Sequence, residues 1–224
     1  MATAPINKKA PLLFVAAFAV MSLAFFLPAG TLDYWQAWAY LAIVFIPAFF
    51  VVAYFLKNDP EFLERRMKFK EREAKQRTVI KLSSILFLIG FLIPGLDRRF
   101  GWSSVPLEFV ITADAVVLLA YLFIFLVFRE NSYAGRTIEV ISGQKVISSG
   151  PYSSIRHPMY LGVFLMYAAT PIALGSYWAL PPFLLILPIL ILRILNEEEV
   201  LRRDLPGYAE YCDKTPYRLL PFVW

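Results

Sequence analysis

Apolar segments long enough to cross a lipid bilayer recur along this chain. A helix that spans the hydrocarbon layer needs ~20 apolar residues, and the segments 11–27, 35–56, 82–96 and 105–128 approach or reach that length. Hydrophobic residues make up 59% of the 224 residues and charged residues only 17%, which is too little charge for a soluble domain of this size. The sequence therefore predicts an all-α integral membrane protein and argues against a soluble domain with one large core.

Two further apolar segments, 159–174 and 184–195, are separated by a Gly-Ser pair and a Pro-Pro pair. Pro158 stands just before the first of them, where a helix can begin, because proline is tolerated in the first helical turn. Each segment is short for a full crossing, so we expect a C-terminal helical hairpin of two tilted or kinked helices. With about four spanning helices ahead of it, the chain would have five to six membrane segments.

Basic residues are unequally divided between the two sides of these expected spans. With the N-terminus in the cytoplasm, 20 of the 22 Lys and Arg residues lie on the cytoplasmic side, and only Arg98 and Arg99 lie on the other. Cytoplasmic segments of membrane proteins carry such an excess. We therefore expect a multi-pass protein with both termini in the cytoplasm, in the bacterial inner membrane. The net charge of +5 then reflects topology and attraction to an anionic leaflet, and nothing supports binding to nucleic acid.

Three segments outside the expected spans have patterns of their own. In the segment 57–81, Phe62, Met67 and Phe69 stand among nine basic and five acidic residues, which is typical either of an amphipathic helix on an anionic leaflet or of a solvated loop helix. Apolar and polar residues alternate over 137–148, a weak signal for a β-hairpin. The tail 196–224 continues the preceding helix and then breaks at a Pro-Gly pair, so we expect it to cover the cytoplasmic face.

Charged and aromatic side chains flank the hairpin. The only histidine, His157, precedes it, and Arg193 and Glu197 lie near its end, so these groups meet only if the hairpin folds back on itself. Taken singly, His157 is typical of a helix cap, and Arg193 with Glu197 of an intrahelical salt bridge. We expect Glu198 and Glu199 to be solvated, and Tyr208 and Tyr211 to pack the tail against the membrane interface.

A longer motif joins these residues. GPYSSIRHPMYLG, followed after the hairpin by RILNEEEVL, YAEYC and TPYRLLP, resembles the isoprenylcysteine carboxyl methyltransferase family and the related phospholipid methyltransferases. The resemblance covers about two fifths of the chain. It implies methyl transfer from S-adenosyl-L-methionine at the cytosolic membrane face, with S-adenosyl-L-homocysteine as the product. Residues 1–128 would form the N-terminal transmembrane helices with their basic loop, and residues 129–224 the cofactor-binding region.

By aligned position, the resemblance also implies which residues bind. Arg193 falls at a substrate-binding arginine, and Thr137 at a cofactor contact where the family has another residue type. The cofactor contacts come from the loop before the hairpin, its first turn and its return arm: Gln144, Lys145, Val146, Ile147, Tyr152, His157, Pro158, Met159, Tyr160 and Glu197.

These residue types suit a sulfonium cofactor that has an amino-acid end and an adenosine end. Glu197 offers a carboxylate to the ammonium or ribose groups, Tyr152 and Tyr160 offer aromatic faces to the cation, and the segment 144–147 offers backbone groups to the adenine. Arg193 suits an acidic acceptor, because its guanidinium donates two parallel hydrogen bonds to a carboxylate or phosphate. An amine or thiol acceptor would need a base, for which His157 or one of the glutamates is the nearest candidate, so we predict Arg193 and His157 as catalytic.

Three functions remain open on these grounds. The first is a methyltransferase for a lipophilic small-molecule or lipidated substrate, with a prenylcysteine-like carboxylate favoured over a phospholipid amine or small thiol. The second is an NADPH-dependent membrane enzyme that resembles sterol reductases, which share a distantly similar hairpin and pocket. The third is a channel or scaffold, motivated by Asp114 within an apolar segment, where a carboxylate costs roughly 2.5 to 3.5 kcal/mol. Membrane lipids are the expected partners, no metal is expected, and the oligomeric state is left open.

Overall fold

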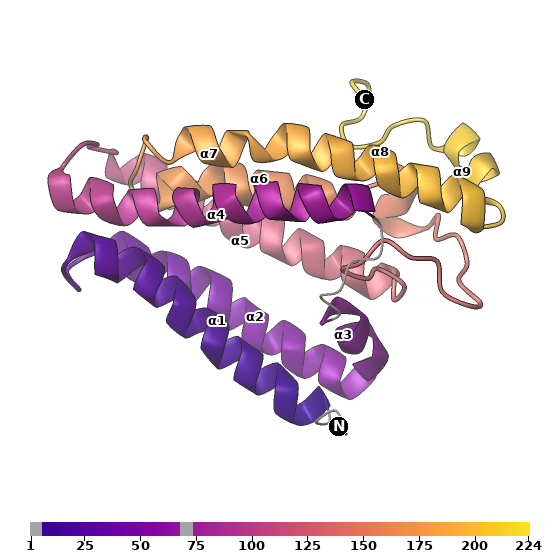
Figure 1. Cartoon of the computed structure of the whole chain (residues 1–224), viewed down its shortest axis with the longest axis horizontal. Coiled ribbons are helices and arrows are strands. Elements are labelled where there is room, and N and C mark those ends of the chain that lie inside the picture. The colour runs from indigo at the N-terminus through magenta and orange to yellow at the C-terminus, as the bar shows by residue number, and fades with distance from the viewer. Residues whose placement is uncertain (1–5, 68–73) are drawn as a thin grey trace.

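The computed structural model describes residues 6–67 and 74–224, and within them the chain is helical without any β-strand (Figure 1). The all-α prediction is confirmed. The elements in chain order are α1 (Ile6–Ala29), α2 (Trp35–Asn58), α3 (Pro60–Arg66), α4 (Ala74–Phe100), α5 (Leu107–Glu130), the 3-10 turn η1 (Gly150–Ser153), α6 (Pro158–Ala173), α7 (Leu180–Leu184), α8 (Ile186–Asp204) and α9 (Tyr208–Lys214).

Within the described residues, five segments are long and apolar enough to cross a membrane: Lys9–Ala29, Trp35–Asn58, Thr78–Phe100, Leu107–Glu130 and Leu180–Asp204. Together with the shorter apolar α6, they match the prediction of four spans and a hairpin. The return arm is longer than expected, because the Pro-Pro pair lies in the first turn of α7 instead of interrupting the helix. Proline is tolerated there, since its missing N–H has no intrahelical partner.

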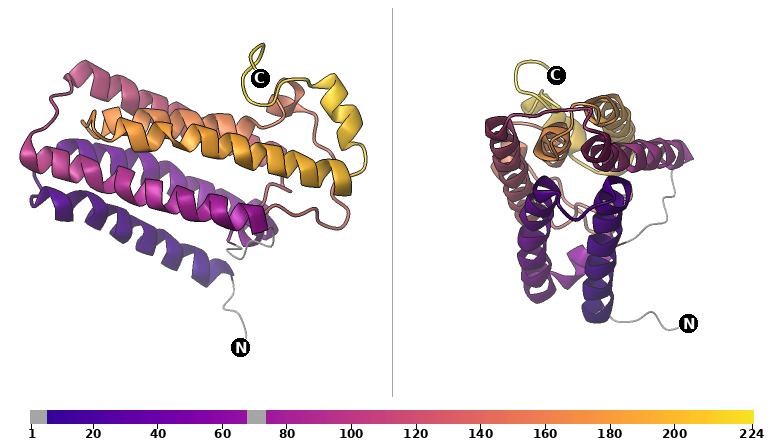
Figure 2. Two further views of the ribbon diagram at one scale, coloured as in Figure 1. Left: turned by 45° about the horizontal axis from the view of Figure 1, so that its top comes forward. Right: turned by 90° about the vertical axis from the view of Figure 1, so that its left-hand side faces the viewer.

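The helices run roughly along one axis, and two ends of the bundle can be distinguished (Figures 1 and 2). The first, here called the site end, gathers α3, the loop 131–157 and the tail from α9 onward. The opposite end, here called the turn end, holds the connections 30–34, 101–106 and 174–179. Helix α1 begins and the chain ends at the site end, so the two outermost described segments lie on the same side, as the topology prediction requires.

Close helix contacts depend on glycine at two positions. A Cβ at Gly162 of α6 would lie 2.5 Å from Cγ1 of Ile124 in α5, and one at Gly95 of α4 would lie 2.5 Å from the backbone oxygen of Phe25 in α1. The pairs α5–α6 and α1–α4 are the most extensively packed helix pairs. Small residues allow such approach where helices associate inside a membrane.

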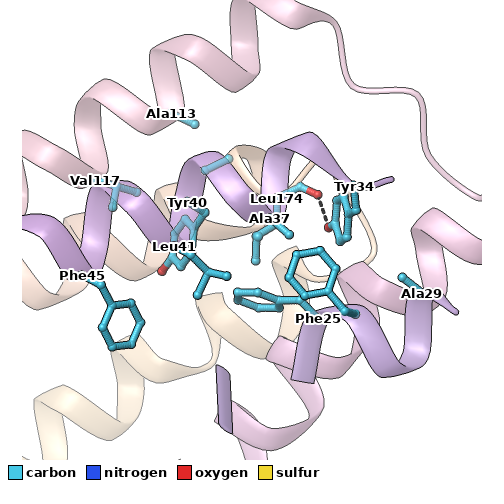
Figure 3. Close-up of a cluster of buried hydrophobic side chains, with 12 residues drawn as sticks. Phe25, Ala29, Tyr34, Ala37, Tyr40, Leu41, Phe45, Ala113, Val117 and Leu174 are labelled. Carbon is cyan, nitrogen blue, oxygen red and sulfur yellow. Dashed lines mark hydrogen bonds between the residues drawn. The ribbon is translucent and has the colours of Figure 1, made fainter. Parts of the chain in front are cut away.

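A buried cluster holds the hairpin turn against the N-terminal helices (Figure 3). The Tyr34 hydroxyl donates to the backbone oxygen of Leu174 at 2.5 Å. Six residues further along the chain, in α2, the Tyr40 hydroxyl lies 2.8 Å from the Thr170 hydroxyl of α6. Both phenols are almost fully buried, and hydrogen bonding removes the penalty that an unpaired polar group would have there. The turn end is therefore anchored from α2.

Helix α3 corrects one interpretation of the basic segment 57–81. Phe62 is buried and stacks on Phe55 of α2 at 4.3 Å between ring centroids, with Phe128 of α5 at 5.1 Å. It therefore docks α3 onto the protein, and neither a leaflet-bound nor a solvated Phe62 is correct. The charged context concealed this, because docking depends on aromatic partners remote in sequence. Phe69 lies outside the described residues.

The alternating segment 137–148 also differs from expectation. A turn is present, with Gly143 at φ +76° and the Gln144 N–H donating to the Ile141 oxygen at 3.1 Å. The flanking residues form no strand, so the β-hairpin prediction is wrong. Val140, Val146 and Ile147 pack instead against buried aromatic residues of η1 and the tail. Burial against the tail takes the place of cross-strand pairing.

Candidate active site

A cavity opens at the site end between the loop 131–147, the first turn of α6, α8 and α9. The two charged clusters flanking the hairpin therefore share one space, as expected if the hairpin folds back. Ten of the predicted site residues line it: Gln144, Lys145, Val146, Ile147, Tyr152, His157, Met159, Tyr160, Arg193 and Glu197.

The remaining predicted residue, Pro158, is not among the lining residues. It is the first residue of α6, with His157 as the preceding cap, and its fixed φ suits a helix start. Pro158 thus sets where the helix begins, while its neighbours His157 and Met159 reach the cavity. Thr137 lines the cavity too.

Tyr160 connects Arg193 and Glu197 across two helices. Its hydroxyl donates to Oε2 of Glu197 at 2.5 Å and accepts from Nε of Arg193 at 2.9 Å. Arg193 also donates from Nη1 to Oε1 of Gln76 at 3.1 Å and from Nη2 to the backbone oxygen of Arg136 at 2.6 Å. The guanidinium is therefore fixed by α4, α6 and the loop before η1, at the edge of the cavity.

Glu198 is the main correction to the predicted site. It is only 3% exposed, although we expected it to be solvated. Its Oε1 accepts from Nε of Arg156 at 2.6 Å and lies 3.2 Å from Nε2 of His157, while Oε2 accepts from Nε of Arg218 at 3.0 Å. One buried carboxylate thus joins α8 to the turn before α6 and to the tail.

The rotation of α8 explains why Glu198 is buried. Ile186, Leu190, Ile194 and Glu198 follow one another at four-residue intervals, and all four are buried. Residues four apart lie on the same face of a helix, so Glu198 continues the apolar face toward the bundle. This spacing was a sequence signal for its burial that the cluster of three glutamates concealed.

The tail is joined to the histidine turn through the backbone as well. The N–H groups of Arg156 and His157 donate to the oxygens of Tyr217 and Arg218, both at 2.9 Å. Nη1 of Arg156 donates to the Thr215 oxygen at 2.7 Å. Burial alone would lower the pKa of Arg156, but the hydrogen bond and charge of Glu198 reverse this and raise it. Arg156 thus stays charged and holds the tail over the site end.

Two tyrosines of α9 belong to the cavity, although we expected them at the membrane interface. The Tyr211 hydroxyl donates to the Tyr152 oxygen at 2.7 Å. The Tyr208 hydroxyl is buried without a hydrogen-bond partner among the described residues, and Tyr208 lines the cavity. Their three-residue spacing after a helix break was the only available signal, because it places both on one face of a short helix.

Burial raises the pKa of the tyrosines outside the expected spans. For Tyr152 it does so to about 12, against a small opposing effect of the Asn131 hydrogen bond, and burial also raises the pKa values of Tyr208 and Tyr211. These phenols therefore stay protonated at neutral pH. They are available to the cavity as hydrogen-bond donors and aromatic surfaces, not as bases.

Asp114 lies apart from the cavity, on α5, and is 9% exposed. Its Oδ1 is buried and has no hydrogen-bond partner among the described residues. In the described part of the chain, no three His, Cys, Asp or Glu side chains are grouped to hold a metal ion.

Comparison with known proteins gives two partial matches. Residues 109–205, from α5 to the end of α8, match the family model of the phospholipid methyltransferases. A Delta(14)-sterol reductase of Mus musculus is 34% identical over 105 residues, or 43% of this chain and 25% of the reductase. The chain thus spans about a quarter of the length of this relative. Both similarities are partial: the family model leaves α1 to α4 and α9 unmatched.

Proposed function

We propose that the protein is an integral membrane methyltransferase that uses S-adenosyl-L-methionine and methylates a lipophilic acceptor at the bilayer surface. The match of residues 109–205 to the phospholipid methyltransferase family supports a membrane methyltransferase. The observation on which the proposal most depends is the single cavity that brings His157, Glu197 and Tyr208 together at the end of a membrane bundle.

The residues around the cavity suit this cofactor. Glu197 offers a carboxylate to an ammonium or to ribose hydroxyls, and the rings of Tyr152 and Tyr160 offer surfaces to a cation. The unpartnered Tyr208 hydroxyl offers a donor that nothing in the described protein uses. When bound, the cofactor supplies an electrophilic methyl group on a positively charged sulfur.

The protein's contribution in this proposal is mainly positioning. Tyr160 holds Arg193 and Glu197 in one arrangement, so an acceptor at Arg193 and a cofactor at Glu197 would be presented to each other in fixed geometry. Restriction of two reactants to a reactive orientation lowers the barrier of a displacement. His157 shares Oε1 of Glu198 with Arg156, which favours a role in shaping the cavity wall.

The acceptor that we favour is a prenylcysteine-like carboxylate. Such a group is ionised at neutral pH and needs no base, which agrees with the protonated tyrosines and with a histidine already engaged by Glu198. A phospholipid amine or a small thiol would require proton removal, for which the ring of His157 is the nearest group. Methylation would take place on the cytosolic side if the topology prediction holds.

A binding experiment tests the cofactor. Purified protein in detergent is expected to gain thermal stability with S-adenosyl-L-homocysteine, because a ligand that binds only the folded state stabilises it by mass action. The variant Glu197→Gln is expected to lose most of this gain, whereas Glu210→Gln, an exposed acid on α9, should retain it. An equal response of both variants and wild type would contradict the assignment of Glu197.

A reductase is the second candidate, because the sterol reductase similarity covers 43% of the chain. NADPH has a second nucleotide half and an additional phosphate, so it needs more cationic contacts than S-adenosyl-L-methionine. Titration of the same preparation with NADPH separates the two candidates. Stabilisation by NADPH and not by S-adenosyl-L-homocysteine would overturn the methyltransferase proposal.

A further inference from the structure

Arg66, at the end of α3, is a partly buried arginine that makes no ion pair with any carboxylate in the described part of the chain. Its Nη1 donates to the Gly135 oxygen at 2.9 Å and lies 3.7 Å from Sδ of Met159. Within the same residues, Nε and Nη2 donate no hydrogen bond. By contrast, the adjacent Arg65 pairs with Asp59 and Glu61.

The Arg66 guanidinium is nevertheless held in one place. It lies over the ring of Phe128, 4.7 Å from the centroid, and α3 is docked through the buried Phe62 on that same ring. A planar guanidinium that is fixed by stacking on one side can grip a carboxylate or phosphate with its free edge. Since the side chain is already ordered, little further conformational entropy is lost on binding.

Two other arginines increase the positive potential at this place. Burial lowers the pKa of Arg66, and the charges of Arg193 and Arg136 lower it further, against the opposing influence of Tyr160 and Glu197. Burial also lowers the pKa of Arg136, with Arg193 adding to the effect. Like charges this close destabilise each other's charged forms. An anion among them would relieve that repulsion.

The cluster adjoins both the cavity and an apolar surface. Met159, which Arg66 contacts, lines the cavity, as does Arg193. Tyr167 is a further neighbour, since the charges of Arg66 and Arg136 both act on its hydroxyl. The ring of Tyr167 packs on Phe87 at 4.6 Å between centroids. A ligand with an acidic head and a hydrocarbon chain matches this arrangement, with the head at the arginines and the chain along the aromatic rings.

We propose that Arg66, together with Arg136 and Arg193, binds the acidic group of a lipid acceptor, a carboxylate or phosphate carried on a hydrocarbon chain. That the bound lipid is the methyl acceptor rests on the proposed function, whereas the anion site itself does not. Arg66 lies outside the matched region 109–205, so this assignment adds a substrate-positioning residue from the N-terminal half of the chain.

The test measures the binding of two anionic amphiphiles, dodecyl phosphate and laurate, to the full chain in nanodiscs of zwitterionic lipid. Arg66→Gln is expected to weaken binding about tenfold or more, the usual effect of losing a hydrogen bond between charged groups. Arg66→Lys is expected to be intermediate, because lysine keeps the charge but not the planar fork. The two probes together distinguish a site for either acid from one that selects phosphate or carboxylate.

Lys57→Gln is the matched control, because it removes one exposed positive charge from the last turn of α2 and should leave affinity unchanged. Dodecanol, which has the chain without the charge, should bind wild type and Arg66→Gln equally. Equal affinity of Arg66→Gln and wild type for both anions would overturn the proposal. If Arg66→Gln does not fold, Arg66→Lys decides, and wild-type affinity in that variant would overturn it.

Inorganic phosphate separates a lipid site from a free-anion site. At the concentration at which dodecyl phosphate saturates the protein, the same concentration of inorganic phosphate is expected not to displace it. Displacement by inorganic phosphate under these conditions would overturn the lipid assignment. Titration of each sample with S-adenosyl-L-homocysteine keeps the two proposals apart. If wild type binds neither anion but responds to S-adenosyl-L-homocysteine, only the anion site is contradicted, whereas anion binding by wild type without any cofactor response contradicts only the methyltransferase.

Discussion

Among the described residues, Asp97 and Glu198 are buried carboxylates at opposite ends of the bundle, and the two are satisfied in different ways. At the turn end, Asp97 is 1% exposed and accepts from the N–H and hydroxyl of Ser103 at 2.7 and 2.6 Å and from the Ser176 hydroxyl at 2.5 Å. At the site end, the 3% exposed Glu198 is held by Arg156, His157 and Arg218. Neutral groups donate the hydrogen bonds to Asp97, whereas mainly cationic groups donate those to Glu198.

The difference indicates what each network is for. The Asp97 network joins two connections, 101–106 and 174–179, and its serine hydroxyls are used again by the N–H groups of Tyr177 and Ala179. It is a self-contained closure of the turn end. The Glu198 network borders a cavity that also has the unpartnered Tyr208 hydroxyl on its wall. The Asp97 network therefore ties two connections of the turn end together, whereas the Glu198 network ties together the wall of the cavity in which we propose that a ligand binds.

The largest expected effect is that of Glu198→Gln. Removal of the carboxylate leaves the charge of the buried Arg156 without its ion-pair partner, and loss of one member of a buried pair costs about 3 to 5 kcal/mol. Unfolding in detergent, followed by circular dichroism, should show this loss together with weaker binding of S-adenosyl-L-homocysteine. Glu199→Gln, at an exposed position of the same helix, is the control. Similar behaviour of the two variants would refute the central role of Glu198.

An intermediate effect is expected for Asp97→Asn. The amide keeps the shape but replaces one accepting oxygen by a donor, and a disrupted buried hydrogen-bond network costs about 1 to 3 kcal/mol. Unfolding should reveal this cost, while the affinity for S-adenosyl-L-homocysteine stays at the wild-type value. A parallel loss of affinity would show that the two ends are coupled and that the distinction between them is incorrect.

The smallest effect on stability is expected for Tyr208→Phe. Its hydroxyl has no partner in the described protein, so its removal should leave the free energy of unfolding within about 0.5 kcal/mol of wild type, since no native hydrogen bond is lost. Affinity for S-adenosyl-L-homocysteine, measured by calorimetry, should fall about fivefold. Tyr211→Phe provides the contrast, because it loses the bond to the Tyr152 oxygen and should be less stable. Unchanged affinity in Tyr208→Phe would remove this hydroxyl from the site.

Much of the site was accessible from local sequence chemistry. The motif around His157 and the segment from Arg193 to Glu197 line one cavity, and Pro158 begins α6 because proline suits that position. Their binding and catalytic roles stay predictions. The error at Glu198 arose because the cluster of three glutamates concealed its four-residue spacing from Ile194 and Leu190, which places it on the buried face of α8.

Two other differences between prediction and structure arise from contacts between segments that are distant in the sequence. Phe62 stands among charges in the sequence, yet it is buried through Phe55 and Phe128, which lie in two different helices. The alternation over 137–148 satisfies a strand pattern, but Val146 and Ile147 pack against the tail and no strand forms. In each case a local pattern is compatible with several environments, and a remote partner selects one.

The amino-acid sequence by itself determined the class of the protein and the approximate number and order of its spans, because a lipid bilayer imposes one length and one polarity on every segment that crosses it. Tertiary structure alone decided that Tyr208 and Tyr211 of α9 line the cavity and that Arg66 of α3 contacts Met159 beside it. These depend on helix rotation and on contacts between distant segments. Such contacts arise only when the helices pack against one another, and no local preference encodes them.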